Sequence, residues 1–142
     1  MIKGQYNVVY LLIVSAMLLF VLYGLVFLAS NFKEEATKTA GNKIVESIAQ
    51  HVENNIFTLK TLSSGAQSVN ITFSIPDRIG EQLYLISAKN NTRFDIRTFG
   101  NPSLIEERNV TFWNVTLEGA AFSSKGKVTL VFVPSENTVT FK

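Results

Sequence analysis

Cysteine is missing from this chain of 142 residues, and histidine occurs once, at His51. Without cysteine the chain has no disulfide framework, no thiolate metal site and no cysteine nucleophile. A lone histidine inside a helical stretch has no second imidazole for a metal site and is typical of a surface or packing residue. The chain also has no glycine-rich phosphate loop. We therefore expect no enzymatic activity, no metal and no cofactor.

The chain also has few aspartates and a small net charge. Asp77 and Asp95 are the two aspartates, and the formal net charge is +2. Asp77 follows Pro76 and is expected in a turn, whereas Asp95 is expected on the solvent-facing side of a strand. Ser63 and Ser64 are expected in a loop that ends a helix, with no neighbouring base in the sequence to activate either of them. The charge balance gives no reason to expect nucleic acid or a strongly acidic substrate. We also expect no small-molecule substrate.

What the chain does contain is one long apolar run, from Val8 to Ala29, without a charged residue. As a helix these roughly 22 residues span about 33 Å, enough to cross a hydrocarbon core with a little tilt. The alternative is a buried core helix, but a domain this small can hardly cover such a segment on every side. Gly24 would permit close contact with another helix, although glycine is common in spanning helices. The run predicts a single membrane-spanning helix, with membrane lipid as a partner.

Two features predict the orientation of this helix. The charges before it, Lys3 and the amino terminus, are positive, while residues 33–38 after it carry both signs. The positive-inside tendency favours a cell-membrane protein with its N-terminus inside and its C-terminal domain outside. Four Asn-x-Thr sequons favour an exported domain too, because they are acceptors for N-glycosylation. The candidate asparagines are Asn70, Asn90, Asn109 and Asn114.

After the apolar run the helical pattern continues, but on one face only. Apolar residues recur at spacings of four and three. Gly41 costs roughly 1 kcal/mol in a helix interior and is where a bend would fall. We expect one helix from near Tyr6 to near Leu59, apolar all round in its first half and amphipathic in its second. The expected apolar stripe consists of Ile44, Ile48, Val52, Ile56 and Leu59, widened by Val45 and Ala49.

Alternation with period two replaces the helical period after residues 63–67. Pro76 and the segments 89–92 and 134–137 are typical of turns, and residues 106–108 are expected to form a solvated connection. Short, half-polar strands of this kind form antiparallel sheets with one covered and one wet face. The expected strands are residues 69–75, 82–87, 93–99, 109–117, 127–133 and 138–142.

The predicted fold class is therefore α+β, with a long N-terminal helix packed on an antiparallel β-sheet. Residues 5–32 are expected to form the transmembrane helix and residues 33–62 its extracellular amphipathic continuation. Residues 63–142 are expected to form a β-rich extracellular domain.

The N-terminus carries a further pattern, because Lys3, Gly4 and Gln5 stand directly before the apolar run. With a spanning helix packed on an antiparallel sheet, this resembles archaeal type IV pilin-like proteins, which have a class III signal peptide. The resemblance implies a leader of residues 1–4 and a prepilin peptidase that cuts between Gly4 and Gln5. It also implies a pilus-like cell-surface filament, in which like or related pilin subunits join through their N-terminal helices.

One residue departs from the family pattern. After the cut the family has Gln-x-Ser-x-Glu-Phe, and here Val9 stands where the glutamate is expected. In the family this glutamate is thought to neutralise the new amino terminus of a neighbouring subunit. Its replacement makes a minor subunit, such as an initiating or tip subunit, easier to reconcile than a major one. The alternative is a membrane-anchored extracellular β module, such as an accessory, stator or adhesion protein outside any filament.

Phe112 and Trp113 would lie on opposite faces of the strand expected at residues 109–117. One of the two rings would then face away from the helix. It would contact a neighbouring subunit or a surface ligand, or else a loop such as residues 104–106 would cover it.

Overall fold

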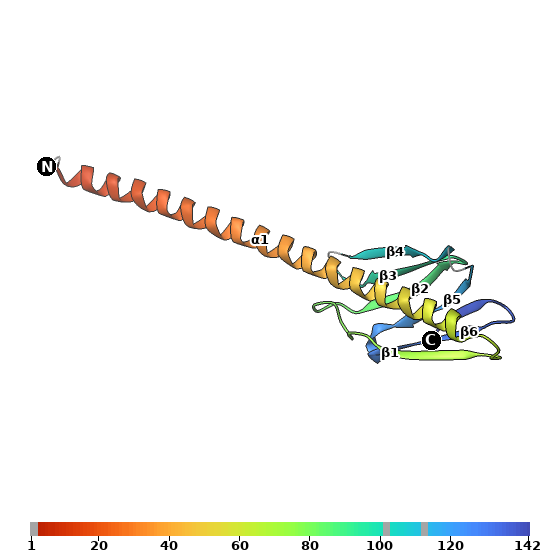
Figure 1. The fold of residues 1–142 in the computed structure, drawn as a ribbon. Helices are drawn as coiled ribbons and strands as arrows, with labels where there is room; N and C mark the ends of the chain where they lie inside the picture. The colour runs from red at the N-terminus through yellow and green to blue at the C-terminus, as the bar shows by residue number, and fades with distance from the viewer. Residues whose placement is uncertain (1–2, 101–102, 112–113) are drawn as a thin grey trace. The chain divides into compact units, whose positions relative to one another are not determined.

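The computed structural model describes the backbone of residues 3–100, 103–111 and 114–142, and side chains from Asn7 onward within these ranges. The chain divides into two compact units, Met1–Thr37 and Lys38–Lys142, each described by itself. One helix, α1 (Lys3–Leu62), accounts for the described part of the first unit and continues into the second (Figure 1). In the second unit it packs on a sheet, so the predicted α+β fold with a long N-terminal helix is confirmed.

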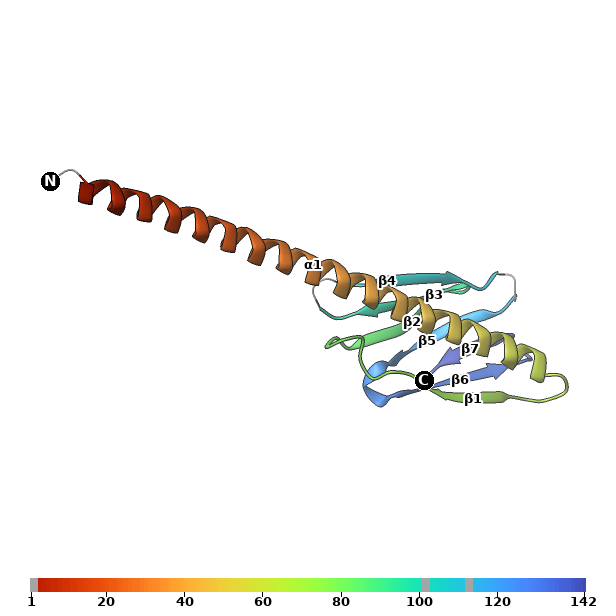
Figure 2. The same ribbon diagram turned by 60° about the vertical axis from the view of Figure 1, so that its left-hand side comes forward.

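Within the described residues, seven strands form one sheet (Figure 2). The order across it is β1-β6-β7-β5-β2-β3-β4, so β1 and β4 are the edge strands. Neighbouring strands are antiparallel except β5 and β7, which run parallel. The strands are β1 (Val69–Ser74), β2 (Tyr84–Asn90), β3 (Arg93–Thr98), β4 (Ile105–Asn109), β5 (Thr116–Phe122), β6 (Lys127–Val133) and β7 (Thr138–Phe141).

The strand expected at residues 109–117 is wrong. The chain instead ends β4 at Asn109 and begins β5 at Thr116, and β4 contains the residues 106–108 that were expected in a solvated connection. Charged side chains are tolerated in β4 because it is an edge strand with β3 alone as its partner. Arg108 lies 3.0 Å from Glu106 and 3.7 Å from Glu46 of α1, so these charges form a small network.

β5 was not predicted over its whole length because it contains glycine and alanine, which have low strand propensity. Gly119 adopts a positive φ of 82°, and a Cβ there would lie 2.6 Å from the carbonyl oxygen of Phe141 in β7. The parallel pairing of β5 with β7 thus brings two backbones closer than any residue with a side chain allows.

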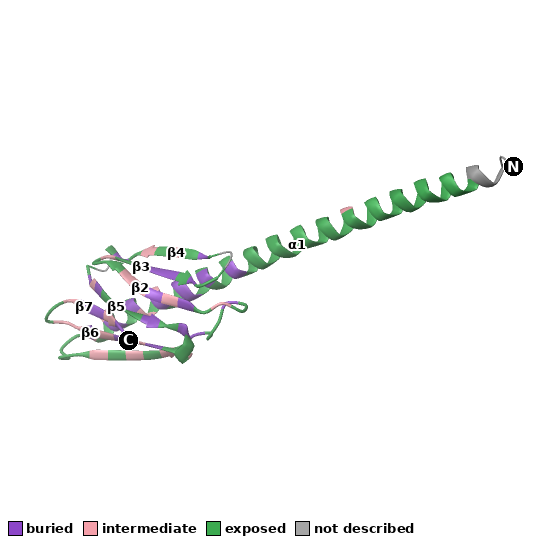
Figure 3. Cartoon of the chain, turned by 180° about the vertical axis from the view of Figure 1, so that it is seen from behind, coloured by how far each residue is buried: buried purple, intermediate pink, exposed green. Residues whose placement is uncertain are grey.

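The core lies between α1 and one face of the sheet, where the buried residues concentrate (Figure 3). Most of the predicted apolar stripe is buried there, but Ile44 is 39% exposed and lies outside the core. Helix α1 passes through Gly41 without interruption, and a Cβ at Gly41 would lie 2.5 Å from Leu104 Cδ1. The glycine therefore permits the close approach of Leu104. The helix contributes Val45, Ile48, Ala49, Val52, Ile56 and Leu59 to the core.

The opposite face of the sheet, here called the open face, carries the alternate residues of each strand. Asp95 belongs to this face, as the pattern predicted, yet it is 4% exposed rather than solvated. Its carboxylate accepts hydrogen bonds from Ser87 Oγ at 2.5 Å and from Arg97 at 3.2 Å. Side chains of neighbouring strands thus bury a charge that a single-strand pattern places in water. Asp77 is exposed, as expected of a turn.

Tyr84, at the start of β2, makes the stability of the second unit depend on pH. Its side chain is fully buried and donates a hydrogen bond to the Pro76 carbonyl at 2.5 Å. Burial, and to a lesser degree the negative charge of Asp77, raise the pKa of Tyr84 well above its usual range. The unfolded chain is therefore expected to lose this proton near pH 10, and the folded chain only at a higher pH.

The free energy of unfolding should consequently be insensitive to this group below about pH 10 and fall above it by at most about 1.4 kcal/mol per pH unit. Tyr84→Phe should lower stability by about 1 kcal/mol at neutral pH through the lost hydrogen bond, and remove this part of the alkaline decline. Denaturant titrations at pH 7, 9 and 11 measure both effects. Tyr23→Phe, at an exposed tyrosine, is the control. An alkaline decline that Tyr84→Phe leaves unchanged would contradict the assignment.

Candidate functional site

The candidate site of the first unit is the surface of α1 itself. Every large apolar side chain from Val8 to Phe32 is between 41% and 79% exposed within this structure. A soluble monomer rarely exposes apolar surface on this scale, since each buried Å² of such surface is worth about 25 cal/mol. Of the described residues, only those of α1 form a helix long and apolar enough to cross a membrane. This surface therefore suits lipid or other apolar helices better than water.

Two serine hydroxyls, one within the apolar run and one directly after it, are satisfied by the helix. Ser15 Oγ donates to the Leu11 carbonyl at 2.8 Å, and Ser30 Oγ donates to the Phe27 carbonyl at 2.8 Å. Neither hydroxyl then needs a partner from water, which is the condition for placing serine in an apolar environment. Gly24 has no atom within 4 Å of the position that a Cβ would take. It leaves a shallow gap where a second helix would fit closely.

Gly4 and Gln5 lie in the first turn of α1, which begins at Lys3, and the side chain of Gln5 is outside the described part. The first turn of a helix has backbone N–H groups without helical partners, so it unwinds at little cost. Val9, at the position where the pilin pattern has glutamate, is 54% exposed and adds to the apolar surface.

All four sequon asparagines are exposed. Asn90 and Asn109 share one geometry, in which the side-chain oxygen accepts from the backbone N–H and the hydroxyl of the threonine two residues on. Asn114 has a positive φ of 47°, and its carbonyl accepts a hydrogen bond from the Asn137 amide. Asn70 lies on the open face of edge strand β1. All four side chains are therefore accessible from solvent, and their glycosylation stays a prediction.

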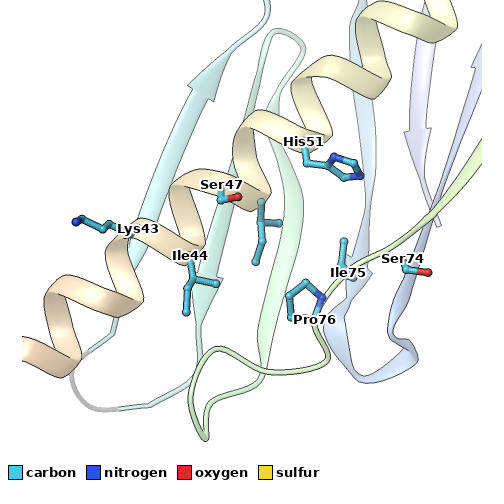
Figure 4. A pocket seen from close by; sticks show the side chains of 8 residues that line it. Lys43, Ile44, Ser47, His51, Ser74, Ile75 and Pro76 are labelled. Atoms are coloured by element: carbon cyan, nitrogen blue, oxygen red, sulfur yellow. The ribbon is translucent and has the colours of Figure 1, made fainter.

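A groove of about 290 Å³ lies between α1 and the segment that follows β1 (Figure 4). His51 is one of its lining residues and is exposed, with its ring edge-on to Phe73 at 5.0 Å between centroids, which agrees with the expected surface or packing residue. No group of three or more potential metal ligands occurs in the part of the chain that the structure describes. Ser63 Oγ donates to the Lys60 carbonyl, as in a loop that ends a helix. The groove is lined by Lys43, Ile44, Ser47, Ile48, His51, Ser74, Ile75 and Pro76.

Helix and sheet both fall within one sequence family. A family of unknown function (DUF7266) matches residues 6–141. The chain belongs to this family. Curated proteins and solved structures gave no match. Because the DUF7266 match starts at Tyr6, it includes the apolar run as well as the sheet, so both belong to the unit that defines the family.

The sequence predicted that one aromatic ring, of Phe112 or Trp113, faces away from the helix, and both residues lie outside the described ones. Residues 104–106, proposed as their cover, instead place Leu104 against α1 and begin β4. The DUF7266 chain does carry outward rings, at Phe99 and Phe122, stacked at 6.3 Å between centroids on the open face. Both occupy alternate positions that face away from α1. The alternation of faces along the predicted strand could have placed Phe99 on the open face. The same prediction for Phe122 required the correct bounds of β5.

Proposed function

We propose that this protein is a structural subunit, minor or major, of an archaeal type IV pilus-like cell-surface filament. Its hydrophobic N-terminal helix would join the apolar helices of like or related subunits. The main support is that the apolar surface of α1 directly follows Lys3, Gly4 and Gln5 and leads into a helix that packs on a β-sheet. Removal of the cationic leader would free this helix to leave the bilayer and enter a helical bundle.

Before assembly the protein would be a single-pass membrane protein with its N-terminus inside. Lys3 and the amino terminus are the positive charges on that side, and the positive-inside tendency supports this orientation. The second unit would then lie outside the cell, with the exposed sequons accessible to a glycosyltransferase. A prepilin peptidase acting at the inner face would be the first partner.

Val9 favours one alternative. A membrane-anchored extracellular β module, with an accessory, stator or adhesion role, needs the apolar helix only as an anchor. It has no use for a glutamate that neutralises a neighbour's amino terminus, so valine fits well there. A minor pilin at the tip or start of a filament accommodates the valine for a related reason, because no subunit precedes it.

The mass of the N-terminal peptide distinguishes the two. It would be measured in native membranes and in material sheared from the cell surface. A chain that begins at Gln5 and occurs in the sheared fraction is the result expected of a filament subunit. A chain that still begins at Met1 and stays in membranes would overturn the proposal and leave the anchored module.

The sequons predict glycan on the native protein, because their exposed asparagines lie in a turn, at the end of β2 or on an edge strand, where an enzyme can reach them. Asn90→Gln and Thr92→Ala should each lower the native mass by one glycan. Asn91→Gln leaves that sequon intact and is the matched control, since Asn91 is its exposed middle residue. Intact-mass spectrometry checks this. An equal mass change, or none, in all three variants would show that Asn90 is not an acceptor.

A further inference from the structure

A cut between Gly4 and Gln5 would create a new amino terminus at the apolar end of α1. The α-amine of a chain has a pKa of about 7.7–8.0, so most of it is protonated at neutral pH. The helix surface that follows is apolar and exposed from Val8 to Phe32 (Figure 3). The first carboxylate along the chain is Glu34, about 43 Å further along the helix. No carboxylate of the same helix therefore reaches the new amine.

An ammonium group in apolar surroundings is costly unless a counter-charge lies beside it. Such surroundings arise when like subunits join through their apolar helices, because neighbouring copies then enclose the new terminus. The pilin pattern supplies a glutamate as the counter-charge. Here Val9 stands at that position, 54% exposed and without charge. A subunit of this sequence therefore needs another way to neutralise its amino terminus.

We infer that Gln5, once it is the first residue, closes into a pyroglutamate ring that removes the charge of the new amino terminus. The inference rests on the proposed function, because it requires the cut between Gly4 and Gln5. It assigns a modification site to this residue. It also makes Val9 compatible with a subunit that has neighbours ahead of it in a filament.

The ring closes without a cofactor, an oxidant or a reductant. The α-nitrogen of Gln5 attacks the side-chain carbonyl carbon Cδ, and a new C–N bond forms. The bond from Cδ to the side-chain amide nitrogen breaks, and ammonia leaves with the proton that the amine gives up. The reacting groups belong to one residue, so covalent geometry holds them close together. In the uncut chain this nitrogen is a peptide amide and is not nucleophilic, so the ring forms only after processing.

The helix itself favours the neutral product. α1 begins at Lys3, so a terminus at Gln5 stays within the first turn. The positive end of the helix macrodipole lies at this terminus and disfavours a protonated amine. A lactam carries no charge, so it removes this repulsion together with the cost of enclosing an ammonium group among apolar helices.

Amine labelling followed by cleavage at methionine tests the inference on the native protein. Freshly sheared material would be denatured, reductively methylated and then cut with cyanogen bromide after Met17. The N-terminal fragment of a processed chain, residues 5–17, contains no lysine, so its α-amine is the one amine that can take the label. The expected fragment is unlabelled and lighter by one ammonia than the uncyclised peptide. A dimethylated amine cannot form the lactam, so ring closure during handling does not mimic this result.

The same fragment separates the two ways to fail. A labelled fragment of residues 5–17 that retains its ammonia would overturn the inference and leave the proposed function intact. A chain that keeps its leader would instead give residues 2–17 with label on Lys3. That result would overturn the proposed function, and the inference with it.

Gln5→Asn tests what the ring does for assembly. Its side chain keeps the amide but is one methylene shorter, so the same attack would close a strained four-membered ring. The processed variant should keep its amine, and its yield in sheared material should fall at least about tenfold, which corresponds to ~1.4 kcal/mol. Processing of the variant is measured on the same fragment.

A second substitution at Val9 provides the rescue and its control. Val9→Glu, added to Gln5→Asn, should restore the yield, because its carboxylate can pair with the amine of a neighbouring subunit. Val9→Gln is similar in size but uncharged and should not restore it. A processed Gln5→Asn chain that is sheared in the same yield as the unaltered chain would overturn the role assigned to the ring.

Discussion

Ile56→Ala should lower the free energy of unfolding of the second unit by about 3–4 kcal/mol. Ile56 lies on α1 with 0% of its surface exposed, in the core between the helix and the sheet. The loss combines the transfer free energy of the removed methyl and methylene groups with the cavity they leave. The total free energy of unfolding of a native protein is only about 5–15 kcal/mol, so this one side chain contributes a large share of the stability.

Ile44→Ala is the matched control for this prediction. Ile44 is the same residue type on the same helix, but it is 39% exposed and lines the groove. Its replacement should cost less than about 1 kcal/mol, because little apolar area leaves the interior and no closed cavity forms. Denaturant unfolding of the full chain in detergent, followed by circular dichroism, measures both. Equal losses at the two positions would mean that α1 does not pack on the sheet with the stripe described above.

Gly4→Val should nearly abolish N-terminal processing if the chain is a pilin-like subunit. Glycine leaves the backbone unhindered at the proposed cut, whereas a β-branched side chain stiffens it and crowds the carbonyl that is attacked. We expect cleavage to slow by at least about a hundredfold, which corresponds to ~2.7 kcal/mol in activation free energy. The chain would keep residues 1–4 and remain in the membrane fraction.

The control for this change is Gly24→Val, at a glycine of the same helix. No atom lies within 4 Å of the position of a Cβ there, so the added side chain meets nothing within its own chain. Processing should be as fast as in the unaltered chain, even if assembly is affected. N-terminal peptide mass and the yield of sheared material report the two steps separately. Unchanged processing of Gly4→Val would show that no peptidase cuts after this glycine.

Strands bounded by turn residues were predictable from alternation. β1, β3 and β7 end within one residue of the predicted bounds, and β6 matches them. In each of these strands apolar and polar residues alternate along the chain, and this alternation can be read from the strand's own sequence. β2 overlaps the strand predicted at residues 82–87, but it begins at Tyr84 and extends to Asn90, so that the turn to β3 is shorter than predicted.

β4 and β5 were not predictable in this way, because the residue types that they tolerate depend on the strands that lie beside them in the sheet. β4 tolerates charges since only one strand flanks it, and β5 contains Gly119 because β7 approaches closely. Burial of Asp95 has the same origin, since Ser87 comes from β2 across the ladder. The pattern of a single strand contains no information on which strand lies beside it.

By itself the sequence determined the apolar run, the long helix and the α+β class. These depend on local quantities, namely the hydrophobicity of consecutive residues, the period of 3.6 or two, and the turn residues between segments. Only the tertiary structure decided the strand order, the parallel β5–β7 pair, the groove beside His51 and the two edge strands. They depend on pairing between residues far apart in the chain, where backbone hydrogen bonds are alike for every strand and packing across the sheet selects the partner.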